Sequence, residues 1–213
     1  MDAVTALASI IAAIAVGAIS PGPSFVLVSR MSLSTTRSHG LAAALGMGTG
    51  GLIFATLAVL GLTALLMKFE WLYFAFKFVG GAYLLYMAYG IFRGARQPIE
   101  ATGISRGWSE LSLARAFGIG LMTQLSNPKT SIFYASIFAA IMPPAPSLWL
   151  LLVLPPTLFL VEAGWYAIVA LAFSGGRVRR VYARLKQWLD YTASAVMGAL
   201  GAKLIMEAVQ RKL

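Results

Sequence analysis

Apolar residues occur along this chain in six long runs, with neither the period of an amphipathic helix nor the alternation of a strand. A helix that crosses the hydrocarbon core of a membrane needs about 20 mostly apolar residues. The candidate spans are Ala3–Val28, Leu41–Met67, Trp71–Phe92, Phe117–Met142, Ser147–Phe173 and Trp188–Val209. Because every backbone amide in lipid must be paired internally, the pattern predicts an all-α, polytopic integral membrane protein with six transmembrane helices.

Composition supports this membrane class. Hydrophobic residues make up 59% of the 213 residues and charged residues only 11%, whereas soluble domains carry about 25% charged residues. The chain contains no Cys, which excludes disulfides and thiolate metal sites, and the single His39 leaves no material for a His-rich centre. Neither a metal nor another cofactor is expected.

The net charge of +10 comes mainly from basic residues in three of the predicted loops. They are Arg30 and Arg37 after the first span, Arg93, Arg96, Arg106 and Arg115 after the third, and Arg177, Arg179, Arg180, Arg184 and Lys186 after the fifth. The positive-inside bias puts these loops in the cytoplasm and both termini outside. Arg211 and Lys212 at the C-terminus favour the reverse orientation. Topology thus accounts for the basic excess, and no nucleic-acid partner is expected.

The six spans form a single membrane domain over residues 1–213 that divides into two halves. Each half has three spans, so the second repeat (116–213) enters the membrane from the side opposite to the first (1–95), after a cytoplasmic loop at 96–115. Such a 3+3 inverted repeat is common in secondary transporters.

Proline interrupts the first span of each half. Ser20-Pro21-Gly22-Pro23 lies in the first span and Ser126-Asn127-Pro128-Lys129 in the fourth. Proline lacks an amide hydrogen and clashes with the carbonyl four residues earlier, so Pro128 is expected to free the carbonyl of Gln124. We expect two broken helices, in which one helix end offers carbonyls to an ammonium group and the next offers amides to a carboxylate. A simple proline kink is the alternative, above all for Pro128.

Charged side chains deep in a span are costly, so they are candidates for function. Three such residues are Lys77, Lys129 and Glu162. Glu162 shares a helical face with Trp165 and Tyr166, and a carboxyl group in apolar surroundings is a candidate proton carrier. The alternative is a structural ion pair of Glu162 with Lys129 or Lys77. Lys77 can also extend to the membrane surface.

Three other patterns in the spans have a structural interpretation beside a functional one. Polar residues recur on one face of the fourth span, namely Thr123, Gln124, Asn127, Thr130, Ser131 and Tyr134. They can line an aqueous path or form hydrogen bonds between helices. The run Gly46–Gly51 resembles a phosphate-binding loop, but it lies in an apolar segment with no Lys-Ser or Lys-Thr after it, which favours close helix packing. Asp190, Lys203 and Glu207 lie near the ends of the last span and are expected at the membrane interface.

Four segments together resemble the LysE/RhtB family of amino-acid exporters, and the resemblance covers nearly the whole chain. They are Ser20–Pro23, Lys77–Leu84, Gln124–Lys129 and Glu162 before Trp165-Tyr166. The resemblance implies a carrier in the inner membrane of a bacterium that expels amino acids or close derivatives, exchanges them for protons and forms a homo-oligomer. One departure is that many members have Asp in the fifth span, whereas Glu162 is one methylene longer.

We therefore predict a proton-coupled exporter of a small amino acid rather than an enzyme. The predicted substrate site comprises both breaks: Ser20, Pro21, Gly22, Pro23, Gln124, Asn127, Pro128 and Lys129. Lys129 would balance the substrate carboxylate, Glu162 would take the proton, and Lys77 would form an ion pair or support the site. Two alternatives are an intramembrane enzyme, which would have to use His39, and a packing subunit with dry helix interiors and no cavity at the prolines.

Overall fold

The polypeptide forms helices throughout its described part. A computed structural model describes residues 2–20, 22–68, 70–96, 111–143, 145–172 and 176–210, without the side chains of 62–77, 176–180 and 182–183. Within these ranges there are eight helices and no strand. They are α1 (Ala3–Ile19), α2 (Pro23–Ser34), α3 (Arg37–Lys68), α4 (Glu70–Gly94), α5 (Leu113–Leu125), α6 (Pro128–Ile141), α7 (Leu148–Ala172) and α8 (Gly176–Gln210). The predicted all-α class is confirmed.

Several of these helices have the length and composition of membrane spans. Among the described residues, three stretches qualify on their own, namely Arg37–Gly61, Leu148–Ala172 and Arg184–Gln210. The pair α1 and α2 forms a fourth when it is counted as one span, with a bend of 58° between its two parts. The three single stretches are 25, 25 and 27 residues long, which is enough for a helix that crosses the membrane.

Helices end and restart at both places where the sequence predicts an interruption. α2 starts at Pro23 after Gly22, and α6 starts at Pro128 after Asn127. Proline fits the first position of a helix because the amide it lacks would have no partner within the helix there. The prediction that Pro128 frees the carbonyl of Gln124 is wrong, because the backbone amide of Asn127 donates to that carbonyl at 3.2 Å.

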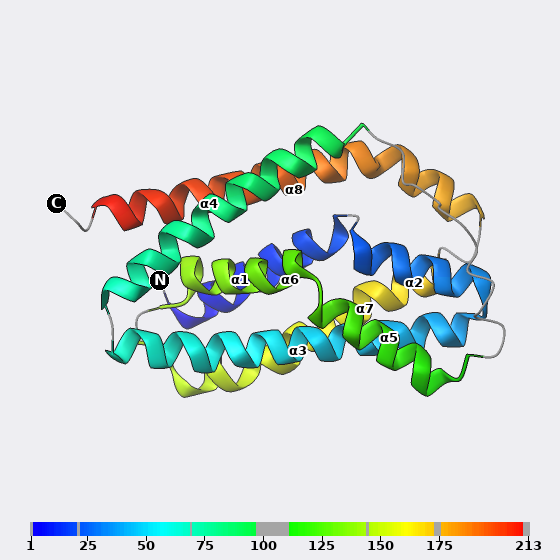
Figure 1. Ribbon diagram of the computed structural model, residues 1–213, viewed down its shortest axis with the longest axis horizontal. Coiled ribbons are helices and arrows are strands. Elements are labelled where there is room, and N and C mark those ends of the chain that lie inside the picture. Colours follow the sequence, from blue (N-terminus) through cyan, green and yellow to red (C-terminus); the bar gives the residue numbers. More distant parts are fainter. Residues whose placement is uncertain are drawn as a thin grey trace.

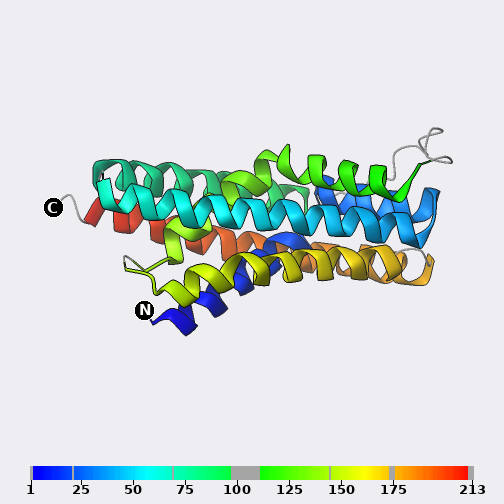
Figure 2. The ribbon, with the colours of Figure 1, turned by 90° about the horizontal axis from the view of Figure 1, so that it is seen from below.

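The helices lie roughly along one direction, with α4 and α8 side by side at one edge (Figure 1). α3 packs along α7 and α5, while α1 contacts α6 and α7. α1 begins and α8 ends at the same end of the bundle, as the side view also shows (Figure 2). The two breaks, between α1 and α2 and between α5 and α6, both lie near the middle of the bundle (Figure 1).

Glycines allow the long helices to approach one another closely. A Cβ atom on Gly46 of α3 would overlap the backbone of Phe117 in α5, and one on Gly81 of α4 would lie 2.8 Å from the carbonyl oxygen of Gly201 in α8. The expectation that the Gly46–Gly51 run serves helix packing is therefore confirmed. The absence of a side chain at these points lets backbones meet without a gap.

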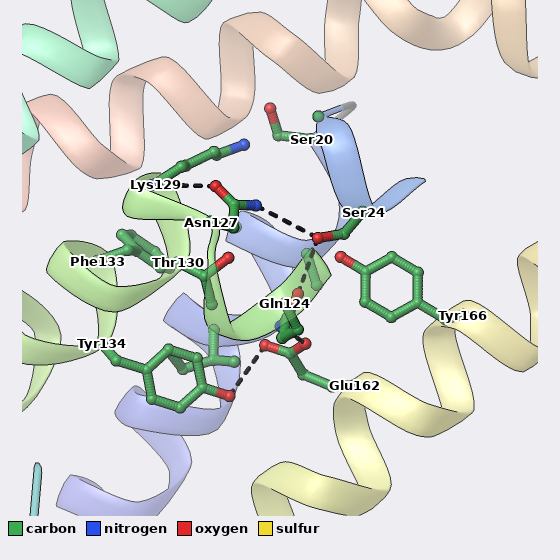
Figure 3. Close-up of a pocket in the computed structure, with 14 residues that line it drawn as sticks. Ser20, Ser24, Gln124, Asn127, Lys129, Thr130, Phe133, Tyr134, Glu162 and Tyr166 are labelled. Atoms are coloured by element: carbon green, nitrogen blue, oxygen red, sulfur yellow. Dashed lines mark hydrogen bonds between the residues drawn. The ribbon is translucent and has the colours of Figure 1, made fainter. Parts of the chain in front are cut away.

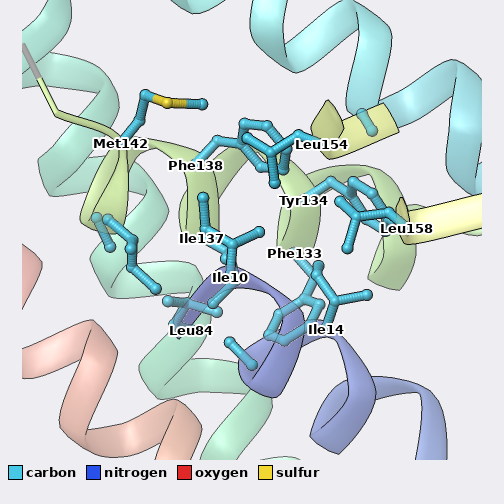
Figure 4. Close-up of a cluster of buried hydrophobic side chains, with 14 of the residues drawn as sticks. Ile10, Ile14, Leu84, Phe133, Tyr134, Ile137, Phe138, Met142, Leu154 and Leu158 are labelled. Carbon is cyan, nitrogen blue, oxygen red and sulfur yellow. The ribbon is translucent and has the colours of Figure 1, made fainter. Parts of the chain in front are cut away.

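Two clusters of buried apolar side chains hold the bundle together. One joins α1, α3, α4, α6, α7 and α8 (Figure 4), and it includes Ile10, Ile14, Leu84, Phe133, Tyr134, Ile137, Phe138, Leu154 and Leu158. The other joins α2, α3, α5 and α7 around Phe25, Val28, Met31, Met47, Tyr166 and Val169. Each helix break joins the two clusters, because α1 and α6 contribute to the first and α2 and α5 to the second.

The last helix extends beyond the span that the sequence predicts. α8 begins at Gly176, so the segment from Arg177 to Lys186, expected as a loop, is helical. Asp190 consequently lies near the middle of α8 and is buried, as is Lys186. Asp190 is therefore enclosed by neighbouring helices, while its place at the membrane interface stays a prediction.

Candidate functional site

A small polar cavity lies where the two helix breaks meet α7. Its volume is about 30 Å³, room for one or two water molecules. The polar side chains in its lining, most of them labelled in Figure 3, are Ser20, Ser24, Gln124, Asn127, Lys129, Thr130, Tyr134, Glu162 and Tyr166. Both breaks and the acidic residue of α7 thus face one shared space. A packing subunit with a dry interior would lack such a cavity.

The cavity gathers most of the residues that the sequence singled out for a site. Ser20, Gly22, Gln124, Asn127, Lys129 and Glu162 all line it. Pro23 and Pro128 start their helices but are not part of the lining. Pro21 lies outside the described residues, and Lys77 lies in α4 with its side chain outside them.

A chain of hydrogen bonds connects one break to the other and then to α7. The Asn127 side-chain amide donates to the Ser24 hydroxyl at 3.3 Å, and that hydroxyl donates to Oε1 of Gln124 at 2.8 Å. Nε2 of Gln124 in turn donates to the carboxyl group of Glu162. All four side chains are buried. The hydrogen-bond chain depends on tertiary structure, because Ser24 lies 100 residues from Gln124 and 103 residues from Asn127 in sequence.

Glu162 is held in this network by neutral donors. The hydroxyl of Tyr134 donates to Oε1 of Glu162 at 2.9 Å, while Gln124 donates to the other oxygen. Glycine in α3 makes room for the pair, since a Cβ atom on Gly51 would lie 2.9 Å from the Tyr134 hydroxyl. An ion pair between Glu162 and Lys129, the structural alternative, is not among the interactions of the described residues.

Lys129 brings a positive charge to the start of α2. Its ammonium group has no hydrogen bond or ion pair with any described residue, and it lies 3.6 Å from where a Cβ atom of Gly22 would be. Figure 3 shows the side chain extending toward Ser20. The side chain that caps α6 is Asn127, which accepts from the amide of Lys129, whereas no side chain caps α2. An ammonium group beside an uncapped helix N-terminus is a favourable place for an anion.

Sequence reasoning missed several members of this site. Ser24 belongs to the interrupted segment of the first span and Tyr134 to the predicted polar face of the fourth span, but neither is in the predicted substrate site. Asp190 had no signal in the sequence. It accepts a hydrogen bond from the Ser20 hydroxyl at 3.4 Å, behind the cavity lining.

The chemistry available here is that of charge and hydrogen bonding. Among the described residues, no three His, Cys, Asp or Glu side chains gather in a way that could hold a metal ion. His39 bonds Thr36 and the carbonyl of Leu111, and it is not in the lining of the cavity. The site can therefore bind a small polar molecule with a negative group and hold a proton on a carboxyl group.

Comparison with known proteins finds relatives along most of the chain. Residues 15–208 match the family model of the LysE type translocator. The chain is 34% identical over 194 residues to the threonine efflux protein of Salmonella typhi, which covers 90% of this chain and 93% of that protein. It is 34% identical over 196 residues to the threonine efflux protein of Escherichia coli strain K12, and the match again covers 90% of this chain and 93% of that protein. It is 31% identical over 195 residues to the E. coli membrane protein YahN, and this match covers 90% of this chain and 85% of YahN. No solved structure matches the chain.

Proposed function

Because the chain belongs to the LysE-type translocator family, we propose that it exports an amino acid across the bacterial inner membrane in exchange for a proton. Translocators are not enzymes, so the intramembrane-enzyme alternative is excluded by family membership. Two relatives are threonine efflux proteins, and the hydroxyl and amide groups around the cavity suit a small polar side chain. Threonine is therefore the first substrate to test.

The Lys129 ammonium group beside the start of α2, which forms no ion pair with a described residue, is the observation that carries this proposal. In the proposed complex, the substrate carboxylate lies between the Lys129 ammonium group and the N-terminus of α2, near Gly22. A charge-assisted hydrogen bond contributes about 1.5–3 kcal/mol. The opposite pole of the substrate faces the end of α1, where Gly17, Ala18 and Ser20 line the cavity; carbonyl and hydroxyl oxygens there accept from an ammonium group.

Substrate entry requires the lining to move. A cavity of about 30 Å³ is too small for an amino acid, so Lys129 and the aromatic rings around it must shift when substrate binds. In the proposed transporter, six spans form two inverted repeats, 1–95 and 116–213, whose relative movement opens the site to each side in turn. The interrupted pairs α1–α2 and α5–α6, and the shared end of the bundle at which α1 begins and α8 ends, support this arrangement. The proposed orientation puts both termini outside.

Glu162 is the proposed proton carrier, and Gln124 is the proposed link to the substrate site. With Glu162 ionised, Gln124 donates to it and accepts from Ser24. A protonated Glu162 needs an acceptor for its own O–H group. The side-chain amide of Gln124 supplies that acceptor if it rotates by about 180° and presents its oxygen to Glu162. The amide nitrogen then donates to Ser24, which frees the Ser24 hydroxyl hydrogen for another acceptor. Protonation of Glu162 in α7 thereby changes the hydrogen bonding of Ser24 at the first break.

The proposal is tested with purified protein in liposomes loaded with labelled threonine. We expect efflux to accelerate several-fold when the outside is made acidic. In Glu162→Gln, threonine–threonine exchange is expected to persist while the acceleration by acid disappears. Glu207→Gln, a change of the same kind on an exposed part of α8, should behave as wild type.

Lys129→Met tests the substrate site separately. Loss of a charge-assisted contact of about 1.5–3 kcal/mol corresponds to a rise of about 10-fold to 100-fold in the threonine concentration for half-maximal exchange. Lys203→Met, which removes a half-exposed ammonium group from α8, is the matched control. Full acid stimulation in Glu162→Gln would disprove the coupling role, and unchanged half-saturation in Lys129→Met would disprove the carboxylate site.

A further inference from the structure

A second buried charged group lies directly behind the candidate site. Asp190 and Lys186, one turn apart on α8, form an ion pair of 2.8 Å, with side chains only 5% and 10% exposed. The other oxygen of Asp190 accepts from the Ser20 hydroxyl at 3.4 Å. Lys186 also donates to the backbone carbonyls of Gly94 at 2.8 Å and Ala95 at 3.3 Å, where α4 ends. One ion pair therefore joins α8, the end of α4 and the first helix break.

The same helix carries a second pair with the same spacing that is much more exposed. Lys203 and Glu207 are 3.8 Å apart, with side chains 50% and 35% exposed. Burying charged groups is costly unless they are paired and hydrogen-bonded. The Lys186–Asp190 pair has these additional hydrogen bonds, to Ser20 and to the carbonyls at the end of α4. The pair therefore fixes the position of α8 relative to the first helix break.

Through Ser20, Asp190 is also connected to the cavity. Ser20, which donates to Asp190, lines the cavity that Lys129 extends into (Figure 3). Asp190 thus contacts the lining from outside the cavity.

We propose that Asp190 is a positioning residue for substrate binding, which fixes Ser20 at the end of α1, while Lys186 fixes Asp190. This inference rests on the proposed function. It predicts that the pair controls the affinity for substrate rather than the rate of the transport cycle, because the pair acts through Ser20, which lines the cavity.

The test measures two quantities of threonine exchange in liposomes. One is the threonine concentration for half-maximal exchange, called half-saturation below, and the other is the maximal rate. Lys186→Met/Asp190→Leu replaces the pair by apolar side chains of similar length, a change that buried ion pairs often tolerate without loss of stability. Lys186→Met/Asp190→Asn removes the charges but keeps an acceptor for Ser20. Lys203→Met/Glu207→Leu makes the corresponding change at the exposed pair. Ser20→Ala is made alone and in the Lys186→Met/Asp190→Leu background.

We expect Lys186→Met/Asp190→Leu to raise half-saturation at least fivefold, with the maximal rate within threefold of wild type. The Asn variant should show a smaller rise, and the exposed-pair control should stay within twofold. Ser20→Ala should raise half-saturation alone but add less than twofold in the Leu background, because its partner is already gone. Wild-type half-saturation in the Leu variant, or effects of Ser20 and the pair that multiply, would overturn the inference. A wild-type protein that exchanges no amino acid would instead overturn the proposed function.

Discussion

Two glycines on α5, Gly118 and Gly120, allow a direct test of how the site is positioned. A Cβ atom on Gly120 would overlap the carbonyl oxygen of Ala43 and lie 2.9 Å from its carbonyl carbon and Cα, all of them backbone atoms of α3 that cannot rotate away. A Cβ atom on Gly118 would meet nothing within 4 Å. Gly120→Ala therefore forces α5 away from α3, whereas Gly118→Ala does not.

The expected difference in stability follows from packing alone. Forcing an extra carbon into a packed contact costs about 1–3 kcal/mol, and both variants gain the same ~0.5–1 kcal/mol from replacing Gly by Ala within a helix. Gly120→Ala should therefore be about 1–3 kcal/mol less stable than Gly118→Ala. For a chain of this size, each kcal/mol shifts the melting temperature by about 2–4 °C.

Thermal unfolding of both variants in the same detergent measures this difference, and exchange in liposomes measures its consequence. Gln124 follows Gly120 by about one turn of α5, and it bonds both Ser24 and Glu162. Displacement of α5 should therefore lower transport in Gly120→Ala and leave it unchanged in Gly118→Ala. Equal melting temperatures of the two variants would refute the close packing of α5 on α3.

Two further predictions concern single hydrogen-bonded groups. Tyr134→Phe removes a donor to the buried Glu162 and should lower the free energy of unfolding by about 1–3 kcal/mol, measured by thermal unfolding. The control Tyr86→Phe, at an exposed position of α4, should have no measurable effect. Equal losses of stability in the two variants would contradict this prediction. At the start of α1, hydrogen bonds from the backbone amide and hydroxyl of Thr5 hold the pKa of Asp2 below its ordinary value. This cap stabilises α1 at neutral pH and is lost as the pH falls through that lowered pKa, so the melting temperature of wild type should fall more steeply below pH 4 than that of Asp2→Asn.

The helix breaks could be predicted because their causes are local. Proline at the first position of a helix and Asn as its cap act over a few residues, so Pro23, Asn127 and Pro128 are informative without a partner. Glu162 stood out for a similar reason, since a carboxyl group amid apolar residues is unusual wherever the chain folds.

The contacts of the site could not be predicted in this way. Asp190 lies 170 residues from Ser20 in sequence, and the apolar run suggested a helix shorter than α8. The sequence also left an ion pair between Lys129 and Glu162 open, although neutral donors on α5 and α6 bind that carboxyl group.

The amino-acid sequence alone determines that this protein is helical, belongs in a membrane and interrupts two of its helices at proline. These properties depend on apolar length and on backbone chemistry within a few residues. Only the tertiary structure decides that Ser24, Gln124 and Glu162 form one network, that Lys129 has no ion-pair partner among the described residues and that Asp190 lies behind Ser20. Hydrogen bonds act over about 3 Å, and separations of that size between distant residues are set by how the helices pack.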